Sequence, residues 1–112
     1  MSCVFCQIAA KEIQSDLIYE DEEFVAFRDL HPQAPVHFLV MPRKHVPRLD
    51  EMEVGDFELI GKMAGIATDL ARREGIADGF RVAVNCGERG GQTIWHVHMH
   101  VLGGRQLRDT IG

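Results

Sequence analysis

Three histidines alternate with apolar residues near the end of the chain, in the run His96-Val97-His98-Met99-His100. Successive side chains of a strand point to opposite faces, so this spacing predicts three imidazoles on one face, roughly 6.6 Å between neighbours. Ordinary polar faces use Thr, Lys, Glu and Arg interchangeably, yet three of the six histidines of the chain lie in this run. The pattern therefore indicates a requirement for imidazole rather than for polarity alone.

Two kinds of chemistry use such an array. Histidines two positions apart on a strand can place two nitrogens on one zinc ion. Alternatively, one neutral imidazole attacks a phosphorus atom while its neighbour stabilises the charged oxygens. The upstream run Gly90-Gly91-Gln92-Thr93 offers backbone N–H groups and a hydroxyl, which suits a phosphate. This loop favours phosphoryl or nucleotidyl transfer, although a Gly-Gly pair alone is equally typical of a tight turn.

Two of the three cysteines, Cys3 and Cys6, have Cys-x-x-Cys spacing. Without a visible secretory signal, this spacing indicates metal or redox chemistry before a structural disulfide. A thioredoxin-like role is disfavoured because no strand is expected before the pair. A tetrahedral zinc ion needs two further ligands, for which the sequence offers His45 and His96. We expect a structural zinc ion at these four residues, with free thiols in a loose N-terminal segment as the alternative.

These residues must be positioned by the helices and strands of the chain. The order of the expected elements predicts an α+β fold with a mainly antiparallel sheet of about five strands. A short helix is expected over residues 4–10. A long helix is expected over 56–74, where apolar positions recur every three or four residues. The predicted strands cover residues 17–19, 24–27, 36–41, 80–85 and 94–102.

The long helix carries two neighbouring apolar stripes. The stripe that we expect to cover the sheet consists of Leu59, Met63, Ile66 and Leu70. The stripe that we expect to meet a partner helix consists of Ile60, Ala64, Ala67 and Ala71. The spacing of Gly61 and Gly65 suggests close packing against the sheet. Because one helix leaves a sheet edge and face unprotected, we predict a homodimer.

The composition predicts one domain over residues 1–112. The hydrophobic fraction of 46% and the charged fraction of 26% argue against a disordered chain. A net charge of −5 disfavours a nucleic-acid polymer or an anionic membrane as partner. No stretch approaches the ~20 apolar residues that span a bilayer, and the first residues do not resemble a signal peptide. We therefore expect a cytoplasmic protein.

The run His96–Leu102 resembles the motif of the histidine triad (HIT) family. The segment Leu102-Gly103-Gly104-Arg105 and the upstream Pro32-Gln33-Ala34-Pro35-x-His37 resemble its Hint branch, and the similarity extends from about Phe5 to Gln106. This resemblance implies a homodimeric HIT-like α+β fold that binds purine nucleotides such as AMP or GMP. It also implies hydrolysis of nucleoside 5′-phosphoramidates of the adenosine phosphoramidate type, with no cofactor needed for catalysis.

The resemblance implies a role for each matching polar residue. His98 would be the nucleophile that forms a covalent nucleotidyl-histidine, and His37 would support the orientation of its imidazole. His100 would bind the nonbridging phosphoryl oxygens, together with Asn85 and the backbone N–H groups of Gln92 and His98. Thr93, where serine is frequent, would reach the phosphate or the leaving group, with Gly91 beside it in the phosphate loop.

The nucleoside would be held by residues earlier in the chain. Asp29 resembles the carboxylate that accepts both ribose hydroxyls, and Leu30 would contribute its backbone. The resemblance also implies an apolar wall around the purine, whereas composition alone would place the same residues in the core. They are Val4, Phe5, Ile8, Ile13 and Phe27.

Two other functions remain open at this point. One is a nucleotide-binding or scaffold protein with weak catalysis, and the other is a dinucleoside polyphosphate hydrolase. The second is disfavoured because Gln92-Thr93 does not match the glutamine expected nearer the triad. The end of the chain, Leu107 to Gly112, lacks the tail tryptophan of some relatives, which leaves the preferred leaving group open.

Overall fold

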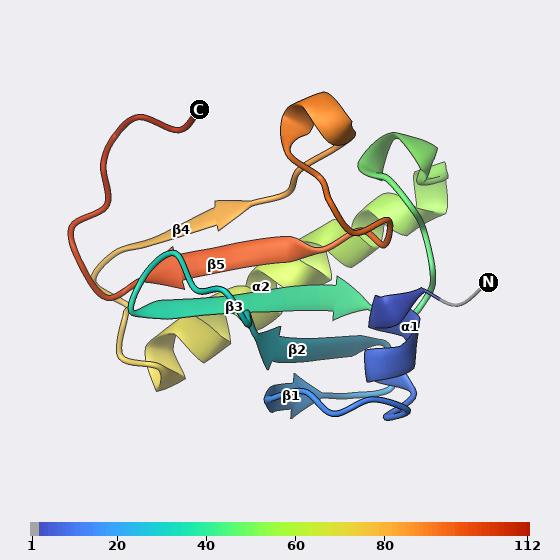
Figure 1. The fold of residues 1–112 in the computed structure, drawn as a ribbon, viewed down its shortest axis with the longest axis horizontal. Helices are drawn as coiled ribbons and strands as arrows, with labels where there is room; N and C mark the ends of the chain where they lie inside the picture. The colour runs from blue at the N-terminus through green and yellow to red at the C-terminus, as the bar shows by residue number, and fades with distance from the viewer. Residues whose placement is uncertain (1–2) are drawn as a thin grey trace.

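The computed structural model describes residues 3–112, in which a five-stranded antiparallel sheet carries two α-helices (Figure 1). The strand order is β1-β2-β3-β5-β4, and every neighbouring pair is antiparallel. The predicted α+β class, with a short N-terminal helix and one long helix, is confirmed. In chain order the elements are α1 (Val4–Ala9), β1 (Leu17–Glu20), β2 (Phe24–Arg28), β3 (Val36–Pro42), α2 (Phe57–Arg73), β4 (Phe80–Ala83) and β5 (Met99–Gly103).

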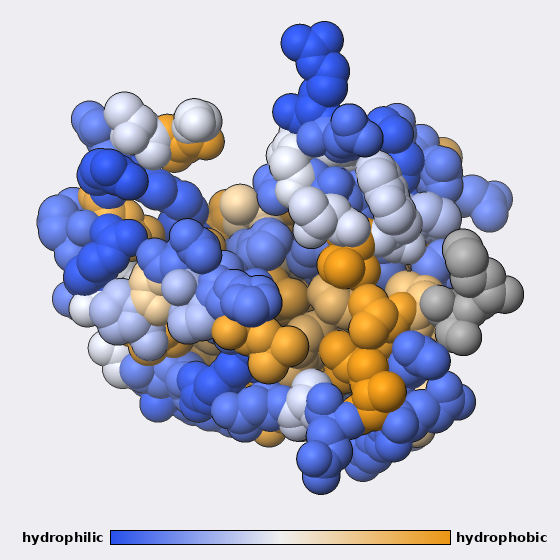
Figure 2. Space-filling model, in the orientation of Figure 1, coloured by the Kyte–Doolittle hydropathy of each residue, from blue (hydrophilic) through white to orange (hydrophobic). Residues whose placement is uncertain are grey.

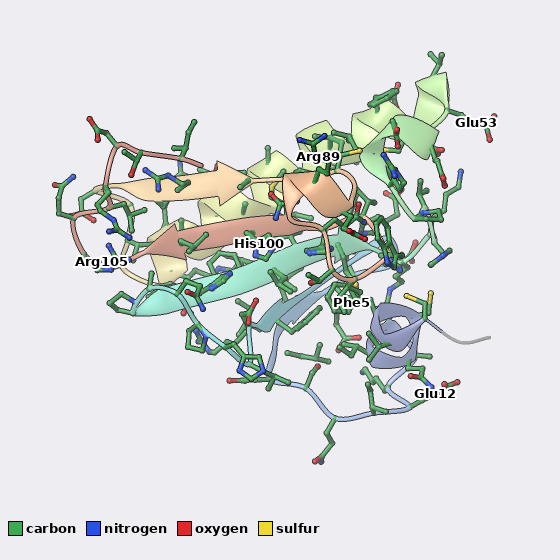
Figure 3. All side chains as sticks on the ribbon, turned by 45° about the horizontal axis from the view of Figure 1, so that its top comes forward. Phe5, Glu12, Glu53, Arg89, His100 and Arg105 are labelled. Carbon is green, nitrogen blue, oxygen red and sulfur yellow. The ribbon has the colours of Figure 1, made fainter. Side chains whose placement is uncertain are left out.

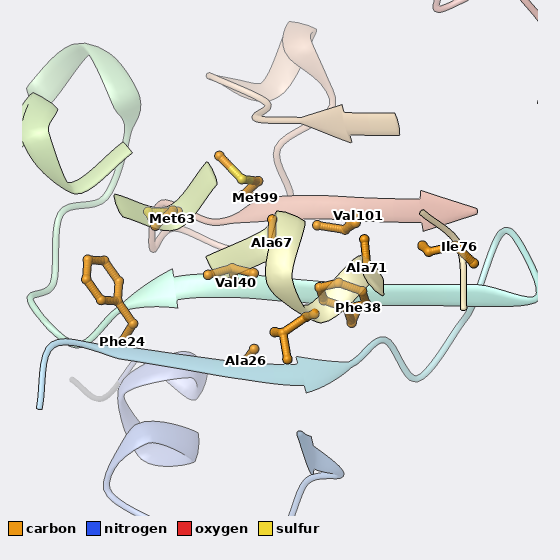
Figure 4. Packing of buried hydrophobic residues seen from close by; sticks show 11 residues of the cluster. Phe24, Ala26, Phe38, Val40, Met63, Ala67, Ala71, Ile76, Met99 and Val101 are labelled. Atoms are coloured by element: carbon orange, nitrogen blue, oxygen red, sulfur yellow. The ribbon is translucent and has the colours of Figure 1, made fainter. Parts of the chain in front are cut away.

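Alternation along the central strands separates the two faces of the sheet. Phe38 and Val40 of β3, with Met99 and Val101 of β5, pack against α2 (Figure 4). Leu39 of β3 points to the opposite face, where a second buried cluster forms with α1. In Figure 1, α2 runs behind the sheet and α1 covers one end of the nearer face. We call these the α2 face and the α1 face.

The last strand is shorter than predicted. Residues 94–98 precede β5 in irregular backbone, and β4 likewise ends at Ala83 rather than at residue 85. The N–H of Val97 donates to the carbonyl of Val46 at 2.8 Å, and its side chain packs in a small cluster with Val46 and Met52. This contact draws the chain away from the ladder between β3 and β5, so only His100 of the three histidines lies in a strand.

Two expectations about α2 were wrong, one about its alanines and one about its glycines. Ala67 and Ala71, expected at a partner, are buried against this sheet beside Met63, because the small side chains let the helix approach closely. Gly61 and Gly65 are exposed, with open space where a Cβ would stand. The close glycine contact lies instead at the end of β5, where a Cβ on Gly103 would stand 2.8 Å from Cδ1 of Ile76. No helix within residues 3–112 has the length and hydrophobicity to cross a membrane.

Candidate active site

A pocket of about 340 Å³ opens on the α1 face, between α1, the end of β2 and the segment before β5. We call it the main pocket; its size falls at the lower end of the range for small-molecule sites. Figure 2 shows apolar surface gathered around a hollow on this side of the molecule. The predicted site residues that line it are Val4, Phe5, Ile8, Ile13, Phe27, Asp29, Leu30, Thr93, His98 and His100.

The imidazole of His98 is held in one orientation. Its Nδ1 lies 2.7 Å from the carbonyl oxygen of His96, so in the neutral ring Nδ1 carries the proton and donates it to this acceptor. Phe5, labelled beside α1 in Figure 3, packs edge-on against the ring, with the centroids 5.0 Å apart. Nε2 therefore keeps a free lone pair, as a nucleophile requires.

A second hydrogen-bond chain fixes the tautomer of His100. The backbone N–H of Gln33 donates to Nδ1 of His37 at 3.0 Å, so the proton of neutral His37 is on Nε2. Nε2 of His37 lies 2.9 Å from Nδ1 of His100. His37 therefore donates to His100, whose own proton is left on Nε2. His37 contacts His100 rather than His98, and the expected support of His98 comes from the carbonyl of His96.

Burial keeps these imidazoles uncharged. Removal from water lowers the pKa of His98 and His37 below the usual 6.5 and lowers the pKa of His100 to about 4. Asp29 opposes the shift at all three rings. At pH 7 the site therefore presents neutral rings, one with a lone pair and one with an N–H donor.

Asp29 follows β2 and is held by the backbone around it. Its N–H donates to the carbonyl of His37 at 3.0 Å, and its Oδ1 accepts the N–H of His31 at 2.8 Å. Its Oδ2 lies 3.5 Å from Nε2 of His37. The carboxylate is thus fixed in the wall of the main pocket beside the histidines. Leu30 is 85% exposed at the rim.

The loop before Thr93 is organised by a side chain that the sequence analysis missed. The buried amide of Gln92 accepts the N–H of Gly87 and donates to the carbonyls of Pro47 and Ile94, at 2.9, 2.6 and 3.0 Å. It joins three backbone segments at the edge of the main pocket. A buried side chain with three backbone partners cannot be inferred from composition or spacing.

The expected phosphate contact of the backbone N–H of Gln92 is not available in this loop. The backbone N–H of Gln92 donates to the carbonyl of Gly87, and that of Gly91 to Glu88, both at 3.0 Å. The N–H of Gln92 is therefore already paired. The side chain of Asn85 donates to the carbonyl of Gly91 at 3.5 Å. Asn85, Gly91 and Gln92 are not among the residues that line the main pocket.

The four predicted metal ligands lie together at the end of α1. Nδ1 of His96 is 3.5 Å from each sulfur, of Cys3 and of Cys6, and 3.3 Å from Nδ1 of His45. Tetrahedral zinc with ordinary bond lengths separates nitrogen and sulfur ligands by about 3.6 Å and two nitrogens by about 3.3 Å. Nε2 of His96 donates to the carbonyl of Pro42 at 2.7 Å, which leaves Nδ1 free for a metal. The donor set fits zinc.

Several other lining residues were not predicted. Leu39 contributes to the floor of the main pocket and Ile94 to its wall. Alternation along β3 could have predicted that Leu39 lines the pocket, because it stands two residues after His37 on the same face of the strand. The others, Gln14, Ser15, Arg28 and His31, lie at the rim without a comparable pattern.

The HIT domain model matches residues 10–107. The chain belongs to the HIT family. Purine nucleoside phosphoramidase of Escherichia coli is 42% identical over 105 residues, which cover 93% of this chain and 88% of that protein.

Solved structures agree with the family assignment. A HIT family hydrolase from Legionella pneumophila superposes with a TM-score of 0.96 at 40% identity, over 99% of this chain and 100% of its own. A zinc-bound histidine triad protein from Mycobacterium smegmatis gives a TM-score of 0.82 at 33% identity, over 94% of this chain and 76% of its own. The HIT-like fold inferred from the sequence is thereby confirmed.

Replacing Gln92 with Met tests the organisation of the loop before Thr93. Met fills a similar volume but leaves the N–H of Gly87 and the carbonyls of Pro47 and Ile94 without their partner. We expect the free energy of unfolding in urea to fall by about 1–3 kcal/mol and the affinity for AMP, measured by calorimetry, to fall with it.

Gln106→Met is the matched control, because Gln106 is exposed and, among residues 3–112, its side-chain amide donates only to the neighbouring carbonyl of Leu107. Its unfolding free energy should stay within about 0.5 kcal/mol of the wild type. If Gln92→Met is as stable and binds AMP as tightly as the wild type, the loop does not depend on this side chain.

Proposed function

We propose that this HIT protein is a hydrolase that cleaves purine nucleoside 5′-phosphoramidates to the nucleoside monophosphate and an amine. The observation that carries the proposal is the pair of fixed tautomers beside one apolar pocket, with a lone pair on Nε2 of His98 and a proton on Nε2 of His100. The 42% identical relative named purine nucleoside phosphoramidase supports the substrate class.

In the first step, Nε2 of His98 attacks phosphorus. The new N–P bond forms as the P–N bond to the amine breaks, and that electron pair stays on the departing nitrogen, which takes up a proton from solvent and leaves. Water then attacks phosphorus and gives up a proton to solvent as the bond to Nε2 of His98 breaks, which releases the monophosphate. The hydrogen bond from Nδ1 to the carbonyl of His96 stabilises the ring as it becomes positive.

His100 stabilises the developing negative charge on the phosphoryl oxygens. Its Nε2–H is directed by the chain from Gln33 through His37, so no reorientation is needed as charge accumulates. The hydroxyl of Thr93 stands in the same pocket as a second donor. Asn85 and Gly91 support this side through the loop, and Gln92 holds the loop through its side chain.

The nucleoside occupies the apolar part of the main pocket. Phe5, Ile8, Ile13 and Phe27 supply contact without directional groups, which predicts loose discrimination between adenine and guanine. The carboxylate of Asp29 stands where it can accept hydrogen bonds from the ribose hydroxyls, and Leu30 forms the rim.

We also propose a structural zinc ion at Cys3, Cys6, His45 and His96. All four positions are protein ligands, so the ion would hold the fold rather than activate water. It would join α1 to the end of β3 and to the segment before β5. Since α1 carries Phe5 and Ile8, the ion would also position the purine wall. Catalysis needs no further cofactor.

A homodimer is the third part of the proposal. The face of α2 that points away from the sheet exposes small residues, among them Gly61, Ala64 and Gly65. At the adjoining sheet edge, β4 exposes Val82, which is 41% accessible. A symmetric contact would cover both features.

The nucleophile is tested with His98→Asn. Loss of the attacking nitrogen should lower kcat/KM for adenosine phosphoramidate by a factor of ~10³ or more, while AMP binding stays within a few-fold of wild type. Mass spectrometry after an alkaline quench should find a nucleotidyl adduct on the wild type and none on the variant. Turnover retained by His98→Asn would refute the covalent mechanism, and AMP binding without turnover by the wild type would favour the scaffold function.

Metal analysis tests the zinc site in protein purified without chelator or affinity nickel. We expect about one zinc per chain in the wild type and almost none after Cys3→Ser with Cys6→Ser, with a lower melting temperature. Cys86→Ser, which alters the cysteine outside the cluster, should keep its zinc. Less than about 0.2 zinc per chain in the wild type contradicts the site.

Sedimentation at micromolar concentration tests the dimer. The wild type should sediment as a dimer, and Ala64→Arg should shift it to a monomer because the arginine adds bulk and like charge at the symmetric contact. Ala10→Arg places the same charge at the end of α1, away from that surface, and should stay dimeric. A monomeric wild type would overturn the proposal.

A further inference from the structure

A second hollow of about 300 Å³ lies beside the main pocket, and we call it the side pocket. Val4, Thr93 and Ile94 line both hollows, so these three residues form a shared wall. The remaining lining residues of the side pocket are Cys3, His45, Pro47 and Trp95. The two hollows thus meet at the hydroxyl-bearing residue that faces the proposed phosphate.

Trp95 gives the side pocket its character. It is the single tryptophan of the chain and is 44% exposed, and Val4 beside it in the lining is 39% exposed. Burial of a large aromatic ring is favourable, so an indole left this accessible beside other apolar residues marks a binding surface. Neither the histidine chemistry nor the metal cluster uses the indole.

We propose that the side pocket binds the apolar, preferably aromatic, substituent of the amine that the reaction releases. This inference rests on the proposed phosphoramidate hydrolysis. With the nucleoside in the apolar part of the main pocket and phosphorus beside His98, the amine must extend over another wall. The wall at Thr93 opens into the side pocket, where Trp95 offers the face of its ring.

The chemistry of the lining selects among amines. The described residues of the side pocket include no Asp, Glu, Lys or Arg, so a second ammonium or carboxylate on the amine gains no ion pair there. An aromatic ring on a short alkyl linker gains stacking on Trp95 and contact with Ile94 and Pro47. A well-placed aromatic pair contributes about two- to twelvefold in affinity.

The kinetic test compares two adenosine phosphoramidates whose amines have similar basicity, those of tryptamine and of ethylamine. The wild type should show a kcat/KM about tenfold higher for the tryptamine compound. Trp95→Ala should reduce this ratio to about twofold or less through the tryptamine compound alone, and Trp95→Phe should restore most of it. Val54→Ala, which shortens an exposed apolar side chain outside both pockets, should keep the wild-type ratio.

A binding measurement tests, independently of turnover, whether the side pocket holds the amine substituent. The probes are nonhydrolysable adenosine 5′-sulfamides that carry an indolylethyl, a benzyl or an ethyl group; the benzyl compound serves the fluorescence measurement because it carries no indole of its own. Because Trp95 is the single tryptophan, its fluorescence in the wild type should respond strongly to the benzyl analogue of the series and weakly to the ethyl compound or AMP. Calorimetry should show tighter binding of the indolylethyl compound.

The outcomes separate the two claims. Turnover of both phosphoramidates with equal kcat/KM in the wild type, or a ratio unchanged by Trp95→Ala, overturns the side pocket and leaves the hydrolase in place. Turnover of neither compound overturns the proposed function. Equal affinity for the indolylethyl and ethyl sulfamides overturns the side pocket whatever the turnover.

Discussion

The carbonyl of His96 sets the chemistry of the site. It accepts the Nδ1 proton of His98 at 2.7 Å, and this bond decides which nitrogen of His98 faces the pocket. The carbonyl can serve a side chain because residues 94–98 leave the sheet ladder before β5 begins. The same departure lets the imidazole of His96 turn toward Cys3 and Cys6. One short irregular segment therefore orients the proposed nucleophile and supplies one residue of the candidate metal cluster.

The N-terminal helix depends on the contacts that it makes with this segment. With only six residues, α1 is too short to be stable alone. Phe5 packs against His98 and against Phe27, with ring centroids 5.0 and 5.2 Å apart, while Cys3 and Cys6 lie at the metal cluster. The proposed purine wall is thus coupled to the proposed nucleophile, His98, on one side and to the candidate metal cluster on the other.

Local sequence patterns predicted most elements, because period and alternation report which side chains face the core. Those patterns failed where tertiary contacts override them. The bond from Val97 to Val46 ended the histidine strand early, and the close approach of α2 buried Ala67, although its small size suggested a partner contact. The four metal ligands came together as predicted. No local pattern predicted the role of the buried Gln92 amide, because its partners are backbone groups, and one of them, the carbonyl of Pro47, is 45 residues away in the sequence.

The charge distribution of the main pocket suits the low charge of the proposed phosphoramidate substrate. Arg28 is the cationic side chain in the lining of the main pocket, and Glu74 engages it with two bonds of 2.5 and 3.1 Å. The imidazoles stay neutral because burial lowers their pKa values. A polyphosphate chain would bring several negative charges to neutral donors, whereas a phosphoramidate brings one. In the proposed hydrolysis the product gains a second negative charge, so neutral donors would hold the monophosphate less favourably than the substrate, and the same electrostatics would promote release of the product.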